Sequence, residues 1–450
     1  MSTPKILFRA VLFATLAVGL IAPAQTQALE DKLVVVTSFP KDLTRKFKAE
    51  FEKYHHGVKV EILSKKTTAG IKYVQETAPS NTSDIFWASA PDAFEVLKGD
   101  GLLQKYTPLA SGIPKKVGAY PINDPDGYYI GFAAAGYGIM WNKRYLKAKK
   151  LQPATEWAQL AKSMYHGHVG MSAPSRSGTT HLTVETILQG EGWEKGWALW
   201  KEIGGNFKTV TERSFGVPDG VNSGDFGLGV VIDFFGLSSK GSGFPVEFVY
   251  PTVTTLVPAN IAILRNAPHP EAAEAFIEFL LSPQGQETLL DPKIRRLPVN
   301  PATYAKAPAG FPNPFKDKSI GAAVKFDVVL SKSRYNVVNS LFDVMITYRL
   351  DDLQAVTRAI QKAEGALAKK PNPKGFELVE QARALVGAVP VTEAEASDPA
   401  FAGIFKKKRK KRADVVPKRQ AEIEEQWDRA IRKNYADALA KAEQAFLMSR

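Results

Sequence analysis

Residues 32–64 decide the fold because they contain one complete strand–helix–strand unit. The unit opens with Lys32-Leu-Val-Val-Val-Thr37, a compact apolar run that predicts a buried strand. Apolar residues then recur at helical spacing from Leu43 to Tyr54, and Val58 to Leu63 alternates as a second strand. A third strand is predicted at Ser83–Ala88. Strands and helices that alternate in this way predict an α/β fold with a mostly parallel sheet and helices on both faces.

Two predicted loops lie where parallel sheets bind ligands. Such ligands bind beyond the carboxyl ends of the strands, where the loops begin. The first strand leads into Thr37, Ser38 and Phe39, and the third strand leads into Ser89 and Ala90. We therefore expect these residues to contribute to a binding site.

A hydroxyl-rich loop at residues 172–181 is the main candidate for an anion site. It follows Val169–Met171, which predicts a short buried strand, and it leads into a predicted helix. The first N–H groups of a helix have no partner within the helix, and the helix dipole adds partial positive charge there, so this end holds anions. The candidate ligands are Ser175, Arg176, Ser177, Gly178, Thr179, Thr180 and His181. A purely structural role, in which Thr179 or Thr180 only caps the helix, stays open.

Composition and the N-terminal segment predict an exported globular protein. The chain has 450 residues, of which 44% are hydrophobic and 23% charged. Lys5 and Arg9 precede an apolar run at Ala10–Ala22 and then small residues, which is the pattern of a secretory signal peptide over residues 1–28. We therefore expect a periplasmic location. The sequence contains no Cys, which excludes thiol catalysis, thiolate metal sites and a bacterial lipid anchor.

The net charge of +13 is concentrated in one short cluster. Residues Lys406–Arg412 are all Lys or Arg and supply seven of the positive charges. Clusters of this kind often bind nucleic acid, but only Phe405 lies beside this one, and a single-strand binder has interleaved aromatic residues. We expect a solvated linker and no nucleic-acid partner, and contact with anionic lipid stays open.

The last third of the chain is predicted to be helical. Residues 324–367 and 376–385 carry helical patterns, and Pro390–Pro399 has the composition of a linker. From Lys418 onward, apolar residues recur mostly every four positions, which predicts an amphipathic helix that needs a partner surface. We expect that surface to be the body of the protein itself. A second copy or a partner protein is the alternative.

Several segments together carry a family resemblance. They are Leu33–Phe39, Asp84–Ala88, Gly138–Asn142, Ser175–His181 with Glu185, Val246–Pro251 and, most specific, Ala267–Gln286 closed by Leu297–Val299. With the signal peptide, these segments make the chain resemble the type II periplasmic solute-binding proteins of ABC importers. Within them it is similar to the branch of ferric-ion, phosphoglycerate and hexose-phosphate binders. The resemblance implies two α/β lobes, joined by crossing strands, that close over a solute by hinge motion.

The resemblance and the composition together imply a division of the chain. Residues 1–28 form the signal peptide, 29–136 the first part of lobe 1, 137–253 lobe 2 and 254–304 the return to lobe 1. Residues 305–390 form C-terminal helices, and 391–450 a basic linker followed by the amphipathic helix. We thus expect a two-lobed fold with a helical C-terminal extension.

One departure from the branch bears on the ligand. Its ferric members often coordinate iron through two adjacent tyrosines, and the matching positions here are Phe234 and Phe235. Phenylalanine has no oxygen to offer a hard cation such as Fe³⁺. The resemblance makes the 172–181 loop a ligand loop, and its hydroxyl, N–H and Arg donors suit a phosphate. A ferric ion held in a chelate stays open.

Ser223 and Asp233 complete the expected site. Asp233 follows a predicted buried strand and, like Glu185, can accept hydrogen bonds from the hydroxyls of a sugar or glycerate. Glu185 lies on a predicted helix, where a plain solvent-exposed position suits it as well. We expect no metal ligand set and no cofactor.

The sequence therefore favours a monomeric periplasmic receptor, not an enzyme. It captures a phosphorylated organic anion, such as a sugar phosphate, phosphoglycerate or phosphonate, and delivers it to an ABC permease. A ferric-ion or ferric-chelate binding protein is the alternative. A sensor co-receptor and a secreted phosphate-ester hydrolase are further classes, although Ser177 and His181 lack the Gly-x-Ser-x-Gly turn of an activated serine.

Overall fold

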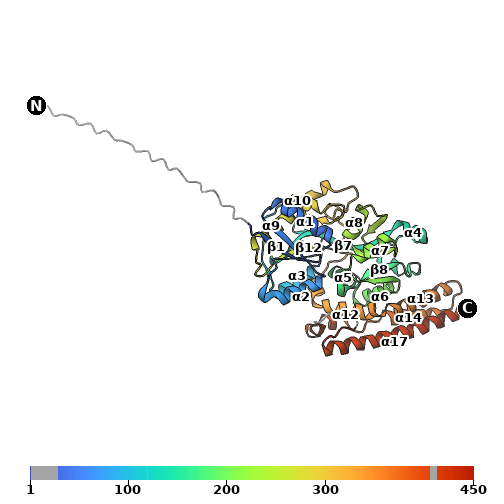
Figure 1. The fold of residues 1–450 in the computed structure, drawn as a ribbon. Coiled ribbons are helices and arrows are strands. Elements are labelled where there is room, and N and C mark those ends of the chain that lie inside the picture. Colours follow the sequence, from blue (N-terminus) through green and yellow to red (C-terminus); the bar gives the residue numbers. More distant parts are fainter. Residues whose placement is uncertain (2–28, 119, 406–412, 450) are drawn as a thin grey trace.

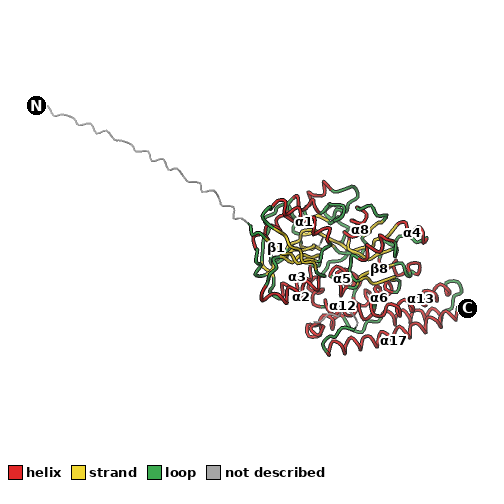
Figure 2. The backbone as a smooth tube through the Cα atoms, in the orientation of Figure 1, coloured by secondary structure: helices red, strands yellow, loops and turns green. Residues whose placement is uncertain are grey.

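The structure is a computed structural model that describes Met1 and residues 29–118, 120–405 and 413–449. The predicted signal peptide beyond Met1 and the basic cluster Lys406–Arg412 lie outside the described residues. Strands occupy the centre of the molecule and helices cover them on both sides (Figure 2). In the described part of the chain, no helix is long and apolar enough to cross a membrane.

The first lobe is built on parallel strands. Its elements are β1 (Lys32–Thr37), α1 (Lys41–Tyr54), β2 (Lys59–Ser64), α2 (Thr67–Thr77), β3 (Ile85–Ala88) and α3 (Pro91–Gly99). Strand β1 pairs in parallel with β2 on one side and with β3 on the other. Helix α1 buries Phe47 against the sheet, where its ring meets that of Trp87 edge-on at 5.6 Å. The apolar spacing that predicted this unit is thus the packing face of the helix.

Strand β7 (Ile130–Asn142) connects the two lobes because its two halves pair with strands of different lobes. Up to Gly136, which is paired with Leu256, the partner is an antiparallel strand of the first lobe. From Tyr137, which is paired with Ile232, the partner is a strand of the second lobe. The chain therefore crosses between lobes inside a hydrogen-bonded strand.

The second lobe follows β7. Its elements are α4 (Lys143–Lys149), β8 (Val169–Ser172), α5 (Gly178–Glu191), α6 (Trp193–Gly204), β9 (Phe207–Thr211), α7 (Gly216–Ser223), β10 (Leu228–Ile232), α8 (Asp233–Gly241) and β11 (Val246–Val249). Strand β8 is parallel to both β9 and β10, whereas β10 and β11 run antiparallel to β7. A Cβ atom at Gly138 would lie 2.0 Å from the carbonyl oxygen of Val249, so glycine permits β11 to approach β7.

The chain then returns to the first lobe. The elements of the return are β12 (Leu256–Leu264), α9 (Pro270–Leu281), α10 (Pro283–Thr288) and β13 (Leu297–Pro298). Strand β12 pairs with both β3 and β7 and so lies at the centre of the sheet order. Short strands β4 (Leu103–Gln104), β5 (Lys116–Val117) and β6 (Tyr120–Pro121) complete the described sheet elements.

The C-terminal extension is a group of helices, and those from residue 335 onward share one apolar core with the second lobe. They are α11 (Val328–Ser333), α12 (Tyr335–Met345), α13 (Leu350–Leu367), α14 (Pro373–Gly387), α15 (Glu393–Ser397), α16 (Pro399–Ala402) and α17 (Lys418–Met448). The stretch predicted as a linker thus contains α15. Helix α17 lies along α13 and α14 (Figure 1), so the partner surface of the amphipathic helix is the protein itself. Trp200 of α6 packs against Phe342 of α12 with ring centroids 6.5 Å apart.

Candidate functional site

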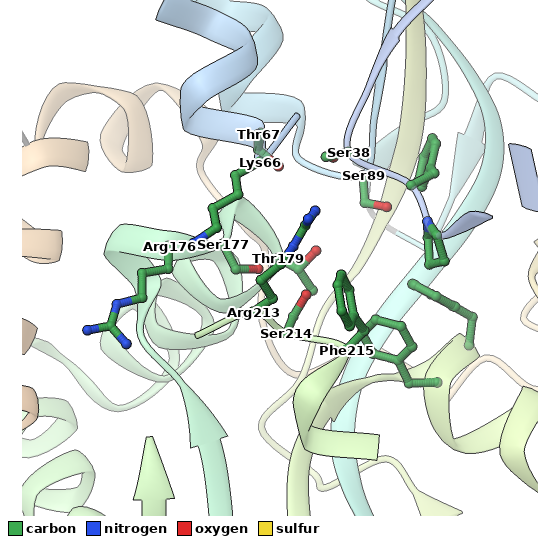
Figure 3. Close-up of a pocket in the computed structure, with 14 residues that line it drawn as sticks. Ser38, Lys66, Thr67, Ser89, Arg176, Ser177, Thr179, Arg213, Ser214 and Phe215 are labelled. Carbon is green, nitrogen blue, oxygen red and sulfur yellow. The ribbon is translucent and has the colours of Figure 1, made fainter. Parts of the chain in front are cut away.

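A cleft takes its lining from both lobes (Figure 3). Its cavity volume, measured as space for the centres of water-sized spheres, is about 30 Å³. The first lobe contributes Ser38, Phe39, Pro40, Lys66, Thr67 and Ser89. The second lobe contributes Arg176, Ser177, Thr179, Arg213, Ser214, Phe215, Phe234 and Phe235. Of the residues expected from the sequence, the lining includes Ser38, Phe39, Ser89, Arg176, Ser177 and Thr179.

The N-terminus of α5 forms one wall of the cleft. Ser177 caps the helix, since its Oγ accepts a hydrogen bond of 3.3 Å from the N–H of Thr180. The cap is therefore Ser177 and not Thr179 or Thr180. The hydroxyl-bearing Thr179 side chain lines the cleft instead. This end of α5 brings together the free N–H groups and hydroxyls that suit an anion.

The two lobes meet beside this helix end. A Cβ atom at Gly178 would lie 2.9 Å from the Cβ of Ala90 and 3.0 Å from the Cγ2 of Thr67, so glycine permits the contact. Glu212 bridges the lobes: its carboxylate lies 3.3 Å from Lys66 Nζ of the first lobe and 3.1 Å from Arg176 Nη1 of the second. The positive charge of Arg176, one of the expected ligands, is thus already paired.

Arg213 is the cation that lines the cleft without a carboxylate partner among the described residues. Its guanidinium carbon lies 4.6 Å from the centroid of the Phe215 ring. Partial burial lowers the pKa of Arg213. Figure 3 shows the Arg213 side chain beside Ser177 and Thr179, whereas Arg176 extends away from them.

A second cation, Arg296, lies beneath the aromatic lining. Its side chain is fully buried, with the guanidinium carbon 4.4 Å from the ring centroid of Phe39 and 3.7 Å from that of Phe234. Its Nη2 donates a hydrogen bond of 3.1 Å to Ser89 Oγ. Burial lowers the pKa of Arg296 to about 9.

The first turn of α8 supplies the aromatic part of the lining. Phe234 and Phe235 have ring centroids 4.3 Å apart and both face the cleft. Asp233, directly before them, is fully buried and accepts hydrogen bonds from the N–H of Gly136 (2.7 Å), Tyr250 Oη (2.9 Å) and the N–H of Phe234 (2.7 Å). Burial raises the pKa of Asp233 to about 6. Asp233 thus fixes α8 to the strand crossing and is not part of the lining.

The structure places other expected residues outside the cleft lining. Ser223 lines a separate groove and donates to the carbonyl of Gly220. Glu185 is bound by the guanidinium of Arg334 at 2.8 and 2.9 Å. His181 is fully buried between α5 and the extension. Thr37, Ala90, Ser175, Gly178 and Thr180 border the cleft loops without lining the cleft themselves. Within the described residues, no group of three His, Cys, Asp or Glu could hold a metal ion.

Lys66, Arg213 and Arg296 are among the residues of the site that were not expected from the sequence. The signal for Lys66 and Arg213 was present, because each follows the carboxyl end of a strand, β2 and β9 respectively. The strand-end rule was applied only to the first and third strands. Arg296 belongs to a loop before β13, and nothing in the local pattern places it under Phe39.

Sequence comparison assigns the chain to a family, and one relative matches most of its length. Residues 80–324 match the family of bacterial extracellular solute-binding proteins. The phosphoglycerate transport regulatory protein PgtC of Salmonella typhimurium is 31% identical over 389 residues, which cover 85% of this chain and 91% of that protein. A match of this length must include part of the extension as well as the lobes. Iron uptake protein A1 of Synechocystis is 24% identical over 276 residues, 58% of this chain and 74% of that protein.

Solved structures bear on the fold. The periplasmic binding protein AfuA from Actinobacillus pleuropneumoniae, with fructose-6-phosphate bound, superposes with a TM-score of 0.62 at 20% identity, covering 69% of this chain and 98% of that one. The apo ferric ion-binding protein A of Pasteurella haemolytica superposes with a TM-score of 0.56 at 16% identity, covering 70% of this chain and 97% of that one. The likeness confirms the predicted fold, a two-lobed type II periplasmic binding protein.

Proposed function

The chain belongs to the bacterial extracellular solute-binding proteins, and from that premise we propose that it captures a phosphorylated organic anion between its lobes in the periplasm. The relatives above are described as a transport regulatory protein, an uptake protein and a binding protein, which supports a receptor over an enzyme. Delivery of the solute to an ABC permease is part of the proposal, because it is the usual partner of this family. The lobe boundaries given above stay a prediction, supported by the change of pairing partner at Gly136 and Tyr137.

One observation carries the proposal. The capped N-terminus of α5, the Thr179 side chain and Arg213, which has no carboxylate partner among the described residues, line the same cleft. A phosphate monoester offers several acceptor oxygens and close to two negative charges, so N–H, hydroxyl and guanidinium donors bind it together. The relative of 31% identity supports the same ligand class, because the name of PgtC refers to a phosphate ester.

Direct binding of ferric iron is disfavoured by the same lining. Phe234 and Phe235 present rings, not oxygen ligands, at the positions where ferric members often have tyrosines. The iron uptake protein of Synechocystis is 24% identical, and the ferric ion-binding protein of Pasteurella haemolytica is 16% identical. These identities are too low to assign their ligand to this chain.

The test is a binding panel on the purified protein. Isothermal titration with 3-phosphoglycerate, glycerol 3-phosphate, glucose 6-phosphate and a phosphonate, each beside its unphosphorylated parent, should give binding only in the phosphorylated members. Mass spectrometry of solute released from the protein identifies the natural ligand. Ferric citrate should produce no tyrosinate-to-iron absorption band. Binding of iron with such a band, and of no phosphorylated compound, would refute the proposal.

A further inference from the structure

Arg296 is a buried cation that forms no ion pair with a carboxylate in the described part of the chain. Its side chain has no exposed surface, and its Nε and Nη1 atoms have no hydrogen-bond acceptor among the described residues. The nearest acid that affects it electrostatically, Asp233, uses both carboxylate oxygens for the bonds described above. A buried charge with unsatisfied donors is costly to the fold. Such a cost is often kept where function needs the charge.

The surroundings of Arg296 direct its effect to the cleft. The guanidinium lies over the rings of Phe39 and Phe234, and both residues line the cleft. Ser89 Oγ accepts the hydrogen bond from Nη2, so the serine O–H is left to donate to a partner in the cleft. Phe234, at a position where iron binders often have tyrosine, thus packs a cation beneath the site.

We infer that Arg296 is a positioning residue of the solute site, one that orients Ser89 as a donor and places a positive charge behind it. The inference rests on the proposed function and adds a preference for phosphate monoesters over sulfate monoesters. A phosphate monoester carries close to two negative charges at neutral pH, whereas a sulfate monoester of the same shape carries one. Attraction to a cation in a water-poor site grows with the ligand charge, so the phosphate ester is selected.

The test compares Arg296→Met with Arg295→Met. Arg295 is the neighbouring cation, but it donates to the carbonyl of Leu290 and lies 6.0 Å from the Phe311 ring, away from the cleft lining. The probes are the tightest-binding ester of the panel above and the sulfate ester of the same alcohol. We expect Arg296→Met to lower the affinity for the phosphate ester at least about tenfold. The ratio between the affinities for the phosphate ester and the sulfate ester should also fall. Arg295→Met should change neither value.

Two further measurements separate positioning from folding. Methionine places an apolar chain between the rings, so Arg296→Met should keep or raise the melting temperature while affinity falls. As a single substitution, Ser89→Ala should weaken binding of the phosphate ester. In a protein that already carries Arg296→Met it should cause little further loss of affinity, since the two residues act as one unit. If the wild type binds no phosphate ester, the proposed function fails. If it binds and either Arg296→Met or Ser89→Ala leaves affinity within twofold, only this inference fails.

A separate observation concerns α11, which is in contact with both lobes. Ser331 of α11 donates to Asp92 Oδ2 of α3 (3.2 Å) and lies 3.1 Å from His181 Nε2 of α5. The other ring nitrogen of His181 lies 2.9 Å from Asn339 Oδ1 of α12. These side chains are all buried. Asp92 and His181 belong to the helices that follow the cleft loops, so the polar cluster lies directly behind the site.

We propose that α11 is a strap that holds the two lobes in the arrangement in which the cleft loops face each other. Helix α11 packs on α3 of the first lobe, and its Val328 lies against the apolar cluster that contains Phe94 of α3. Its contact with His181 of the second lobe therefore loosens when the lobes separate. The strap therefore adds stability to the liganded arrangement without touching the solute. By this route the extension responds to whether the cleft is occupied.

The variant Ser331→Ala tests the strap, with Ser333→Ala as the matched control. Ser333 lies in the same helix but donates to the carbonyl of Leu330, outside the cluster. We expect Ser331→Ala to raise the dissociation rate of every bound panel ester by a similar factor, about fivefold. Ser333→Ala should leave the rate unchanged. Equal rates in both variants, or a loss confined to the melting temperature, would overturn the strap.

Discussion

At the scale of single residues, Ser177 and Thr179 divide the work of the α5 terminus. Ser177 both caps the helix and lines the cleft, so its removal affects stability and binding together. Thr179 lines the cleft, and its hydroxyl makes no bond in the cap. Thr179 is therefore the position at which binding can be separated from helix stability.

Thr179→Val should lower affinity for the bound phosphate ester about tenfold, because a hydrogen bond to a charged ligand contributes about 1.5–3 kcal/mol. The melting temperature should not change, since valine keeps the shape and the cap remains. Calorimetric titration and thermal unfolding measure the two effects. Thr180→Val is the control, as its side chain is not in the lining, and it should bind like the wild type. Equal losses in both variants contradict the assignment.

Asp233 should titrate unusually high for a carboxyl group. Burial raises its pKa to about 6 from the ordinary 3.8, so the folded state holds its proton more tightly than the unfolded state. Its contribution to the free energy of unfolding is therefore fully present below the unfolded pKa, declines between about pH 4 and pH 6, and is lost above. Carbon-detected NMR of labelled aspartates should show one carboxyl titrating near pH 6 that is missing in Asp233→Asn. Titration of all carboxyls below pH 5 would contradict it.

At the scale of elements, α17 belongs to the core. Trp427 of α17 is buried and stacks on the Phe405 ring at 5.1 Å, nearly parallel. Trp427→Ala should lower the free energy of unfolding by about 3–5 kcal/mol, the usual cost of a large buried truncation. Denaturant unfolding measures the change, with the exposed Arg429→Ala as a control near zero. Affinity for the panel ester, measured under folding conditions, should stay the same. A change under about 1 kcal/mol would show that α17 is only loosely attached.

The sequence predicted elements better than it predicted the site. Strand β1 and helix α17 follow from apolar spacing, because burial of one face leaves a local record in the chain. The sequence suggested Thr179 or Thr180 as the cap of α5, whereas the cap is Ser177. Hydroxyls at neighbouring positions give the same local signal. The role of Arg296 could not be predicted from the sequence, because its place between Phe39 and Phe234 joins three distant parts of the chain. Likewise, nothing in the sequence indicated that Glu185 forms an ion pair with Arg334 of the extension, which is far from it in the chain.

At the scale of the whole molecule, the extension should move with the second lobe. The chain has no cysteine, so pairs of spin labels can be introduced at chosen exposed lysines. With the panel ester, the distance between Lys72→Cys of α2 and Lys433→Cys of α17 should change, as hinge closure moves the first lobe. The distance between Lys195→Cys of α6 and Lys433→Cys should stay constant. Pulsed electron resonance measures both. A constant first distance would contradict hinge closure, and a changing second distance would contradict a shared body.

The common core of the second lobe and the extension has a consequence for protein engineering. One way to build a biosensor of altered specificity is to exchange one lobe of a two-lobed binding protein. Here Trp193 donates to the carbonyl of Val391, and Lys201 donates to that of Ala388, so the lobe and the extension complete each other's interiors. A graft cut at the end of the lobes would leave both surfaces open. The smallest interchangeable part of this protein is the second lobe together with its helices.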